Sequence, residues 1–252
     1  MATQSVSATE LGATARRDRW WVAPAATASA LTAFGIYSIV VALMNSDYLY
    51  TEGGAKYLSP FYSPDLKSWG LHISFTYAFF VMWVPLGFRL TCYYYRGAYY
   101  RAFWRAPSAC AVREPHAKYS GETRFPLIAQ NVHRYFWYAA LFVGILLTYD
   151  VAQAFRGPDG NFGIGLGSLI LLANVIFIWG YTLGCHTCRH ITAGRLKNFS
   201  THPVRYWAWT KVSWLNARHL QFAWISLGTL MLSDLYIMLL ASGAFSDPRI
   251  FN

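Results

Sequence analysis

Five stretches of this chain are long, apolar and almost free of charged residues. They cover residues 20–44, 69–88, 135–149, 164–183 and 220–240. A bilayer core about 30 Å thick takes roughly 20 helical residues to cross, and backbone amides in lipid must find their hydrogen bonds within the segment. The runs do not alternate as the strands of a membrane barrel do. We therefore expect an all-α integral membrane protein, a bundle of five transmembrane helices.

Composition agrees with this expectation, because only 13% of the residues are charged, where a soluble domain carries about 25%.

The third run is the shortest, and it crosses the bilayer fully only if its helix continues past Asp150 through residues 151–155. The polar residues 1–19 are expected to form a tail, and residues 20–252 a single membrane domain.

Basic residues gather on one side of the five runs. Of the 21 Lys and Arg residues, 17 lie in the tail or in residues 89–134 and 189–218, and four lie in the remaining segments. This asymmetry predicts a cytoplasmic N-terminus and, after five crossings, a C-terminus outside. The basic residues behind the net charge of +10 are then expected to contact lipid headgroups or an acidic partner, and nucleic-acid binding is not expected.

The two basic inner segments are also aromatic. Residues 99–105 and 205–211 combine Tyr, Trp and Phe with Arg or Lys, as helices lying in the membrane interface do. Two interpretations stay open here: the segments form a docking face for a partner, or they simply lie on lipid.

Cysteine and histidine share the basic side. All four Cys and six of the seven His lie there, and only His72 lies near the outer edge. Residues 184–190 read GCHTCRH, which places four potential metal ligands at the inner end of the fourth run. Disulfides are not expected on the reducing side of a membrane. The cluster predicts a metal centre, and packing with hydrogen bonding is the alternative.

The types of ligand in this cluster limit which metal or cofactor it can bind. A c-type haem needs His directly after Cys-x-x-Cys, but Arg189 intervenes. Zinc in a Cys₂His₂ site fits, and so does a Rieske-type [2Fe–2S] cluster with two Cys on one iron and two His on the other. Cys188 and His190 match a Cys-x-His half of the Rieske pattern, whereas Cys110 and His116 are spaced more widely than its second half.

One unbroken helix cannot carry all four ligands around one centre. At about 100° per residue, Cys185 and Cys188 share one face while His186 and His190 share another. Either the chain unwinds after Gly184, or the other inner segment contributes ligands, and we favour the second. The expected ligands are Cys110, His116, Cys185, Cys188 and His190, with Cys92 and His186 in reserve.

Other inner-edge residues suggest a haem or a quinone site. His133 and His219 lie just before the third and fifth runs and form a possible axial pair for haem b. His133, Arg134 and Tyr135 are candidates for binding a quinone carbonyl or delivering its protons. Asp150 and Asp234 lie toward the outer ends of their runs, where ionisable groups are functional suspects.

The five-run pattern, the sequence His133-Arg134-Tyr135 and the cluster 184–190 resemble the membrane-anchor (cytochrome b-like) subunit of actinobacterial succinate dehydrogenases, the succinate:quinone oxidoreductases. The resemblance covers essentially the whole chain. Two-haem anchors place histidine pairs at both membrane edges, and this chain departs from them because its outer half offers only His72.

The resemblance implies a mechanism in the bacterial plasma membrane. A flavoprotein subunit oxidises succinate, an iron–sulfur subunit on the cytoplasmic face passes the electrons on, and this chain delivers them to menaquinone through the Rieske-type centre or haem b. A further small membrane subunit is compatible with this scheme, and succinate chemistry is not expected on this chain. The competing interpretations are a transporter with Asp150, Asp234 and the Cys/His group on its path, and a zinc-binding scaffold.

Overall fold

The computed structural model describes residues 12–71, 75–115, 121–125, 127–157 and 160–252 of the 252-residue chain. Its internal contacts divide the chain into two units. The smaller unit comprises Met1–Tyr37 and Arg89–Val132, and the larger comprises Ser38–Phe88 and His133–Asn252.

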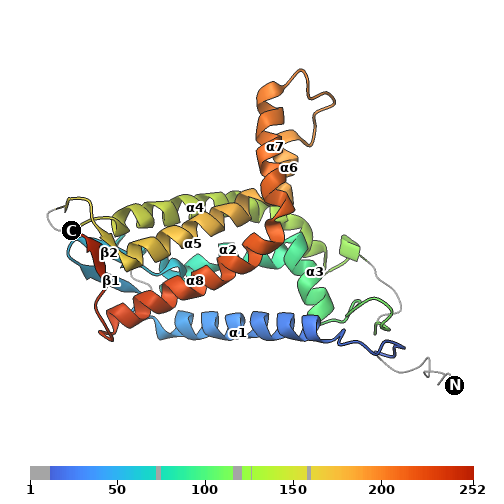
Figure 1. Ribbon diagram of the computed structural model, residues 1–252, viewed down its shortest axis with the longest axis horizontal. Helices are drawn as coiled ribbons and strands as arrows, with labels where there is room; N and C mark the ends of the chain where they lie inside the picture. Colours follow the sequence, from blue (N-terminus) through green and yellow to red (C-terminus); the bar gives the residue numbers. More distant parts are fainter. Residues whose placement is uncertain (1–11, 72–74, 116–120, 126, 158–159) are drawn as a thin grey trace. The chain divides into compact units, whose positions relative to one another are not determined.

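Helices make up most of the described chain (Figure 1). The α-helices are α1 Val22–Met44, α2 Tyr77–Thr91, α3 Tyr93–Ala102, α4 His133–Ala154, α5 Leu166–Leu183, α6 His186–Ala193, α7 Pro203–Ala217 and α8 His219–Ala241. The short strands are β1 Leu49–Glu52, β2 Ala55–Leu58, β3 Ile164–Gly165 and β4 Arg249–Phe251. Strands β1 and β2 pair antiparallel, as do β3 and β4. Single 3₁₀ turns cover Pro60–Tyr62 and Gly121–Thr123, and a longer one covers Leu127–Val132.

Four helical segments of the described chain are long and apolar enough to cross a membrane. They are α1, the segment Leu127–Ala154 that contains α4, α5 and α8. The helical nature of the membrane domain is thereby confirmed, and α4 continues past Asp150 as expected. Helix α2 differs from the expected span 69–88, because it starts at Tyr77, contains Pro85 and has 15 residues. Such a helix is about 22 Å long, so the fifth crossing stays a prediction, as does the orientation of the termini.

The basic aromatic segments are helical at slightly different bounds from those expected. Residues 205–211 lie inside α7, whereas residues 99–105 overlap only the last part of α3. In the smaller unit, Arg96 pairs with Glu122 at 2.7 Å, and Gln130 donates to the Tyr99 hydroxyl at 2.9 Å. These contacts tie α3 to the 3₁₀ turns that precede α4.

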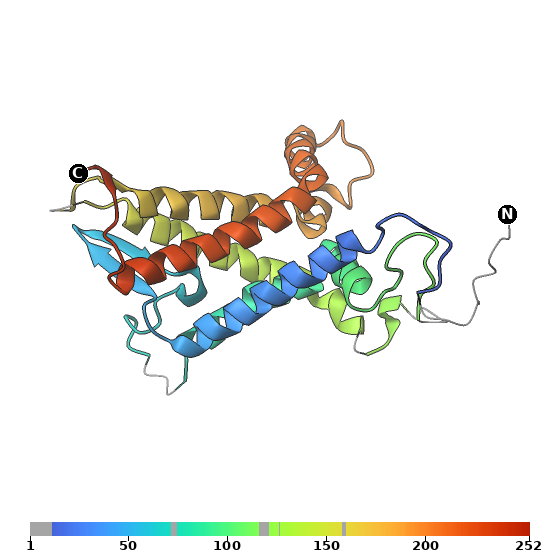
Figure 2. The ribbon, with the colours of Figure 1, turned by 60° about the horizontal axis from the view of Figure 1, so that its bottom comes forward.

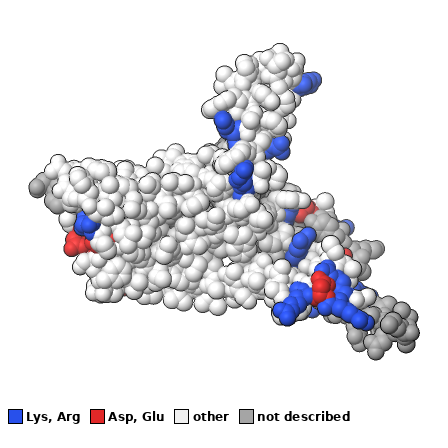
Figure 3. Space-filling model, in the orientation of Figure 1, with Lys and Arg blue, Asp and Glu red and all other residues white. Residues whose placement is uncertain are grey.

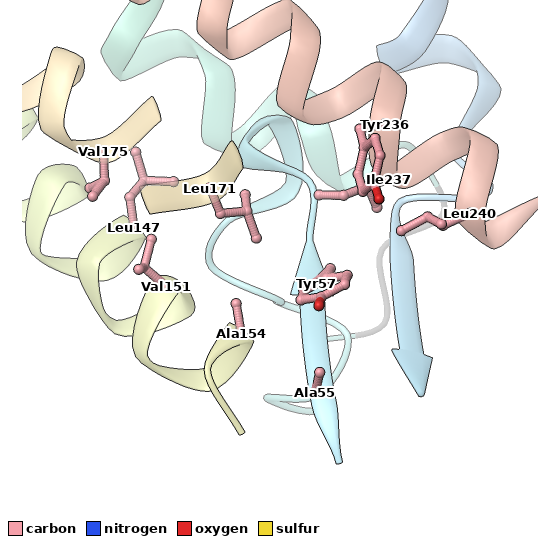
Figure 4. Packing of buried hydrophobic residues seen from close by; sticks show 10 residues of the cluster. All are labelled: Ala55, Tyr57, Leu147, Val151, Ala154, Leu171, Val175, Tyr236, Ile237 and Leu240. Atoms are coloured by element: carbon pink, nitrogen blue, oxygen red, sulfur yellow. The ribbon is translucent and has the colours of Figure 1, made fainter. Parts of the chain in front are cut away.

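Helices α4, α5 and α8 lie side by side in the larger unit (Figures 1 and 2). Figure 4 shows Leu147 and Val151 of α4 packed toward Leu171 and Val175 of α5, within one buried cluster that extends to α8 and to strand β2. Small residues allow the close approach. A Cβ on Gly180 would lie 2.6 Å from the ring of Phe222 in α8, a small-residue contact typical of membrane helices.

The two ends of this helix group differ. At one end, here named the hairpin end after the β-hairpin formed by β1 and β2, these two strands pack against α8 and α4. At the other, the basic end, α6 and α7 form a helical hairpin that projects from the helix group (Figure 1). Figure 3 shows Lys and Arg on this projecting hairpin, while the surface over α4, α5 and α8 in the same view is uncharged.

Buried hydrogen bonds hold the hairpin end together. The Asp247 carboxylate accepts from the hydroxyls of Tyr57 and Tyr236, each at 2.6 Å, and from the backbone N–H of Gly167 at 2.9 Å. Tyr57 is fully buried and Asp247 is 5% exposed. A buried carboxylate is tolerated only when such donors surround it, so this network fixes β2 and the C-terminal segment on α5 and α8.

Replacing Tyr57 tests the network. Tyr57→Phe removes one donor from a buried carboxylate and should lower the free energy of unfolding by about 2 kcal/mol. Tyr50→Phe is the matched control in the same β-hairpin, because the Tyr50 hydroxyl bonds Glu52 at an exposed site, and its effect should stay within about 0.5 kcal/mol. Thermal unfolding of the purified complex measures both variants, and equal midpoints would contradict the role given to Tyr57.

The same site predicts a pH dependence. Burial, and secondly the hydrogen bond to Asp247, raise the pKa of Tyr57 above its ordinary value. The neutral phenol is therefore favoured in the folded protein, and its contribution to stability is fully present below pH ~10. That contribution should be lost as the pH rises from about 10 through the raised pKa, and Tyr57→Phe should lack this part of the alkaline transition.

Candidate functional site

The chain breaks its helix between α5 and α6. Gly184 ends α5, and Cys185 adopts an extended conformation (φ −67°, ψ 146°) before α6 starts at His186. The side chain of Asn216 in α7 donates to the Gly184 carbonyl at 2.7 Å, and the Cys185 sulfur accepts from the backbone N–H of Thr187 at 3.4 Å. Of the two ways to arrange the cluster 184–190, the structure has the one in which the helix is interrupted.

This break brings Cys185 to His133. The imidazole Nε2 of His133, the first residue of α4, lies 3.0 Å from the sulfur of Cys185. Cys185 is 2% exposed. A thiol and an imidazole from separate helices thus meet at the basic end, which sequence reasoning missed because it assigned His133 to a haem or a quinone.

Cys188 lies one helical turn beyond Cys185 and is also buried. Burial raises the pKa of the Cys188 thiol. Without a metal this cysteine is therefore a neutral thiol at physiological pH, as is typical of cysteines in apolar surroundings.

His219, the first residue of α8, lies on the other side of the break. It is 6% exposed, and a Cβ on Gly184 would lie 3.3 Å from its Nδ1. The imidazole therefore lies close against the backbone at Gly184. His133 and His219 therefore approach the break from different helices, and Cys188 follows it in α6.

Aromatic rings connect the two histidines. His133 stacks on Phe88 with ring centroids 5.0 Å apart, Phe88 lies 5.2 Å from Tyr181, and Tyr181 stacks on His219 at 4.9 Å. The rings come from α2, α4, α5 and α8. In this series of ring contacts, Phe88 and Tyr181 lie between the two imidazoles that were considered as ligands for haem b.

Two of the remaining expected metal ligands, His190 and Cys110, have surroundings of their own. His190 is exposed, and its Nδ1 lies 2.9 Å from a guanidinium nitrogen of Arg134. Because arginine only donates, Nδ1 must be an acceptor and is occupied. Cys110 is exposed in the smaller unit, where its carbonyl accepts from Arg16 at 2.9 Å. His116 lies outside the described residues.

In the part of the chain that the structure describes, no three His, Cys, Asp or Glu side chains come close enough together to hold a metal ion. The expected set of five ligands includes residues of both units and His116, so it stays a prediction. Within the larger unit, the helix break turns Cys185 toward α4 and leaves His190, in the second turn of α6, facing Arg134. Of the reserves, Cys92 is buried before α3 and His186 is exposed at the start of α6.

The three candidate quinone residues have different surroundings. His133 contacts Cys185, Arg134 contacts His190, and Tyr135 is 74% exposed. Consecutive helical residues point about 100° apart, so Arg134 and Tyr135 can contact one ligand while His133 faces the break. The assignment of these residues to a quinone stays a prediction.

The acidic residues within the spans have structural partners at the hairpin end. Asp234 is fully buried and accepts from the Ser59 hydroxyl, and Asp150 accepts from the Ser63 hydroxyl. Both serines flank the 3₁₀ turn at Pro60–Tyr62. These contacts fasten the loop after β2 to α4 and α8, which explains both carboxylates without a permeation path.

Comparisons with known proteins give two findings. The family model described as actinobacterial succinate dehydrogenase subunit SdhC matches residues 22–243. A solved structure described as the Mycobacterium smegmatis Sdh1 complex in the apo form contains a chain that is 55% identical, with a TM-score of 0.88. The match covers 95% of this chain and 94% of that chain. No protein among those with curated functions matches.

Gly184→Ala tests the helix break. The new Cβ would lie 2.7 Å from the Gly180 carbonyl oxygen and 3.1 Å from that of Leu215, so backbone must move. We expect a loss of about 1–3 kcal/mol, measured as a lower unfolding midpoint of the purified complex. Gly228→Ala in α8 is the control, because nothing lies within 4 Å of its added Cβ. Equal midpoints for the two variants would show that the break is not tightly packed.

Proposed function

The chain belongs to the actinobacterial family of succinate dehydrogenase subunit SdhC, and from this membership we propose that its basic end delivers electrons from succinate oxidation to membrane quinone. It is a multi-pass protein of the bacterial plasma membrane, and its partners are the iron–sulfur and flavoprotein subunits of the complex. Succinate is oxidised on the flavoprotein partner. This chain provides the membrane part of the electron path.

We place the basic end on the cytoplasmic side. The support is the charge distribution, with 17 of 21 Lys and Arg residues in the tail and the two inner segments. The α6–α7 hairpin is rigid enough to form part of a docking face: Arg189 stacks over Trp209 at 5.0 Å and donates to Ser213 at 3.0 Å. Cations and aromatic side chains on a projecting element suit an acidic partner surface.

The proposed electron carrier is a Cys/His-ligated centre at the break between α5 and α6. The observation that carries this proposal is the 3.0 Å contact between His133 Nε2 and the Cys185 sulfur. Cys185, Cys188, His133 and His219 supply the donor types of a Rieske-type [2Fe–2S] cluster, two thiolates and two imidazoles. Because no three such side chains of the described chain converge on one point, binding a cluster would require these side chains to move toward one another. Such a centre supplies one-electron transfer when bound. His133 and His219 take the places that the sequence assigned to His116 and His190, and the Nδ1 of His190 accepts from Arg134.

The protein's own residues have definable roles at this site. Gly184 allows the helix to end, so that Cys185 faces α4 instead of continuing along α5. Phe88 and Tyr181 cover the two imidazoles and restrict water there, and a nonpolar shell of this kind tunes a redox centre. Haem b between His133 and His219 is the competing cofactor, and its spectrum is distinct.

The quinone headgroup is proposed to bind at the inner end of α4. Tyr135 is exposed and Arg134 lies beside His190 of α6, and both can donate hydrogen bonds to a quinone carbonyl, while His133 contacts Cys185 of the proposed electron carrier. A menaquinone that accepts two electrons also takes up two protons, and the inner edge of the membrane gives access to protons from water.

Spectra of the purified, reduced complex test the carrier. Cys185→Ser should abolish a Rieske-type EPR signal, and His133→Ala should abolish or shift it. Cys110→Ser is the matched control, since Cys110 is exposed and lies apart from the break in sequence. The clusters of the iron–sulfur subunit should be unchanged in every variant and serve as the internal standard. Haem bands, or a Rieske-type signal that survives Cys185→Ser, would overturn the assignment.

Quinone reduction tests the role of Tyr135. Tyr135→Ala should raise the KM for a soluble quinone several-fold, because a hydrogen bond is worth about 1 kcal/mol. Succinate oxidation by an artificial acceptor that bypasses the anchor should keep its rate. Tyr149→Ala, which changes another exposed tyrosine of α4 (61% exposed) near the hairpin end, is the control. An unchanged KM for quinone in Tyr135→Ala would exclude this residue from the site.

A further inference from the structure

A cavity of about 330 Å³ opens at the basic end of the larger unit, between α4 and the α6–α7 hairpin. Its walls come from three separate segments. They are Arg134, Tyr138, His190, Ile191, Arg195 and Arg205. Three of the six residues are arginines and none is acidic, so the cavity has a strongly positive lining.

No acidic side chain from this part of the sequence can neutralise that charge. Residues 160–233 contain six Lys and Arg residues and no Asp or Glu. Three guanidinium groups around one cavity repel one another. An anion in the cavity would remove this repulsion, because planar guanidinium groups bind phosphate oxygens with paired hydrogen bonds.

Two of the arginines are held in position by contacts that leave N–H groups for a ligand. Arg205 donates through Nε to the Thr192 carbonyl at 2.8 Å and through Nη2 to the Ile191 carbonyl at 3.5 Å. These carbonyls lie near the C-terminal end of α6, where a cation is favoured. Arg134 uses one nitrogen on His190. Since a guanidinium has five N–H donors, each arginine retains donors that can bind an anion.

His190 adds a further donor. Its Nδ1 accepts from Arg134 at 2.9 Å, so the neutral ring carries its proton on Nε2. The lining therefore offers hydrogen-bond donors from four basic side chains, together with the Tyr138 hydroxyl, which can donate as well.

An apolar stripe continues from the cavity along α4. Tyr138 lines the cavity, and Phe142, Ile145 and Tyr149 follow at helical spacing on the same side of the helix. These four side chains are 51–61% exposed. A site that combines cations at the membrane edge with an exposed apolar stripe along a spanning helix matches a phospholipid, with a charged headgroup and long acyl chains.

We propose that this cavity binds the phosphate group of an anionic phospholipid, whose acyl chains lie along the exposed side of α4. The proposal does not depend on the Cys/His centre, but the cavity shares Arg134 with the proposed quinone site, so its test substitutes only Arg195 and Arg205. The stripe favours a lipid over an acidic segment of a partner subunit, because a peptide bound by the arginines alone would not need twelve residues of apolar helix surface. A lipid at this position would link α4 to the α6–α7 hairpin.

The test uses the complete complex after its native lipids are removed. A short-chain phosphatidylglycerol is titrated in detergent, and bound lipid is counted by native mass spectrometry. Arg195→Gln should weaken binding about five-fold, and adding Arg205→Gln about five-fold more, as expected for about 1 kcal/mol per charge. Arg195→Gln alone keeps the bonds from Arg205 to α6, so its result is informative even if the double variant misfolds.

The control is Lys197→Gln with Lys211→Gln, which removes two charges from the same segment outside the cavity. It should keep the affinity for phosphatidylglycerol, and phosphatidylcholine should bind weakly to every form. Equal weakening by both pairs of substitutions would overturn the proposal, because it would indicate general attraction to the basic surface. Inorganic phosphate displacing the lipid at similar concentration would overturn the lipid assignment. Loss of the iron–sulfur subunit in Arg195→Gln without a change in lipid binding would assign the cavity to that partner.

Discussion

The absence of hydrogen-bonding partners in the hydrocarbon core governs this structure. Every backbone amide within the spans must be paired along its own helix, so α4, α5 and α8 run unbroken through their apolar length. Breaks, turns and short strands are confined to the two ends. The extended residue Cys185, which would be costly in the middle of a span, lies instead at the basic end, where Asn216 binds the carbonyl that α5 leaves free.

The two ends of the larger unit satisfy their polar groups in different ways. At the hairpin end, the carboxylates of Asp150, Asp234 and Asp247 each accept from a hydroxyl donor of the described chain. At the basic end, cations exceed acidic groups and donors remain available around a cavity. The two ends thus differ in charge: carboxylates with hydroxyl donors lie at the hairpin end, and arginines line the cavity at the basic end.

The break between α5 and α6 shows how one glycine organises chemistry from several helices. A Cβ on Gly184 would lie 3.3 Å from the His219 imidazole, and the next residue, Cys185, contacts His133. Because α4 and α8 both begin at this level, the first residue of each faces the break.

The apolar runs determined the membrane class and most of the helices, because bilayer thickness and the cost of burying charge act on sequence directly. The second run was the exception, since Pro85 and a late start at Tyr77 shorten its helix. Which side chains meet was decided only by tertiary structure. Helical periodicity placed Cys185 with Cys188, but the direction of the chain after Gly184 turns Cys185 toward His133 and His190 toward Arg134. Residue spacing does not show where the helix after Gly184 breaks or how the chain turns there. That turn depends on contacts with Asn216 and His219, which come from distant parts of the sequence.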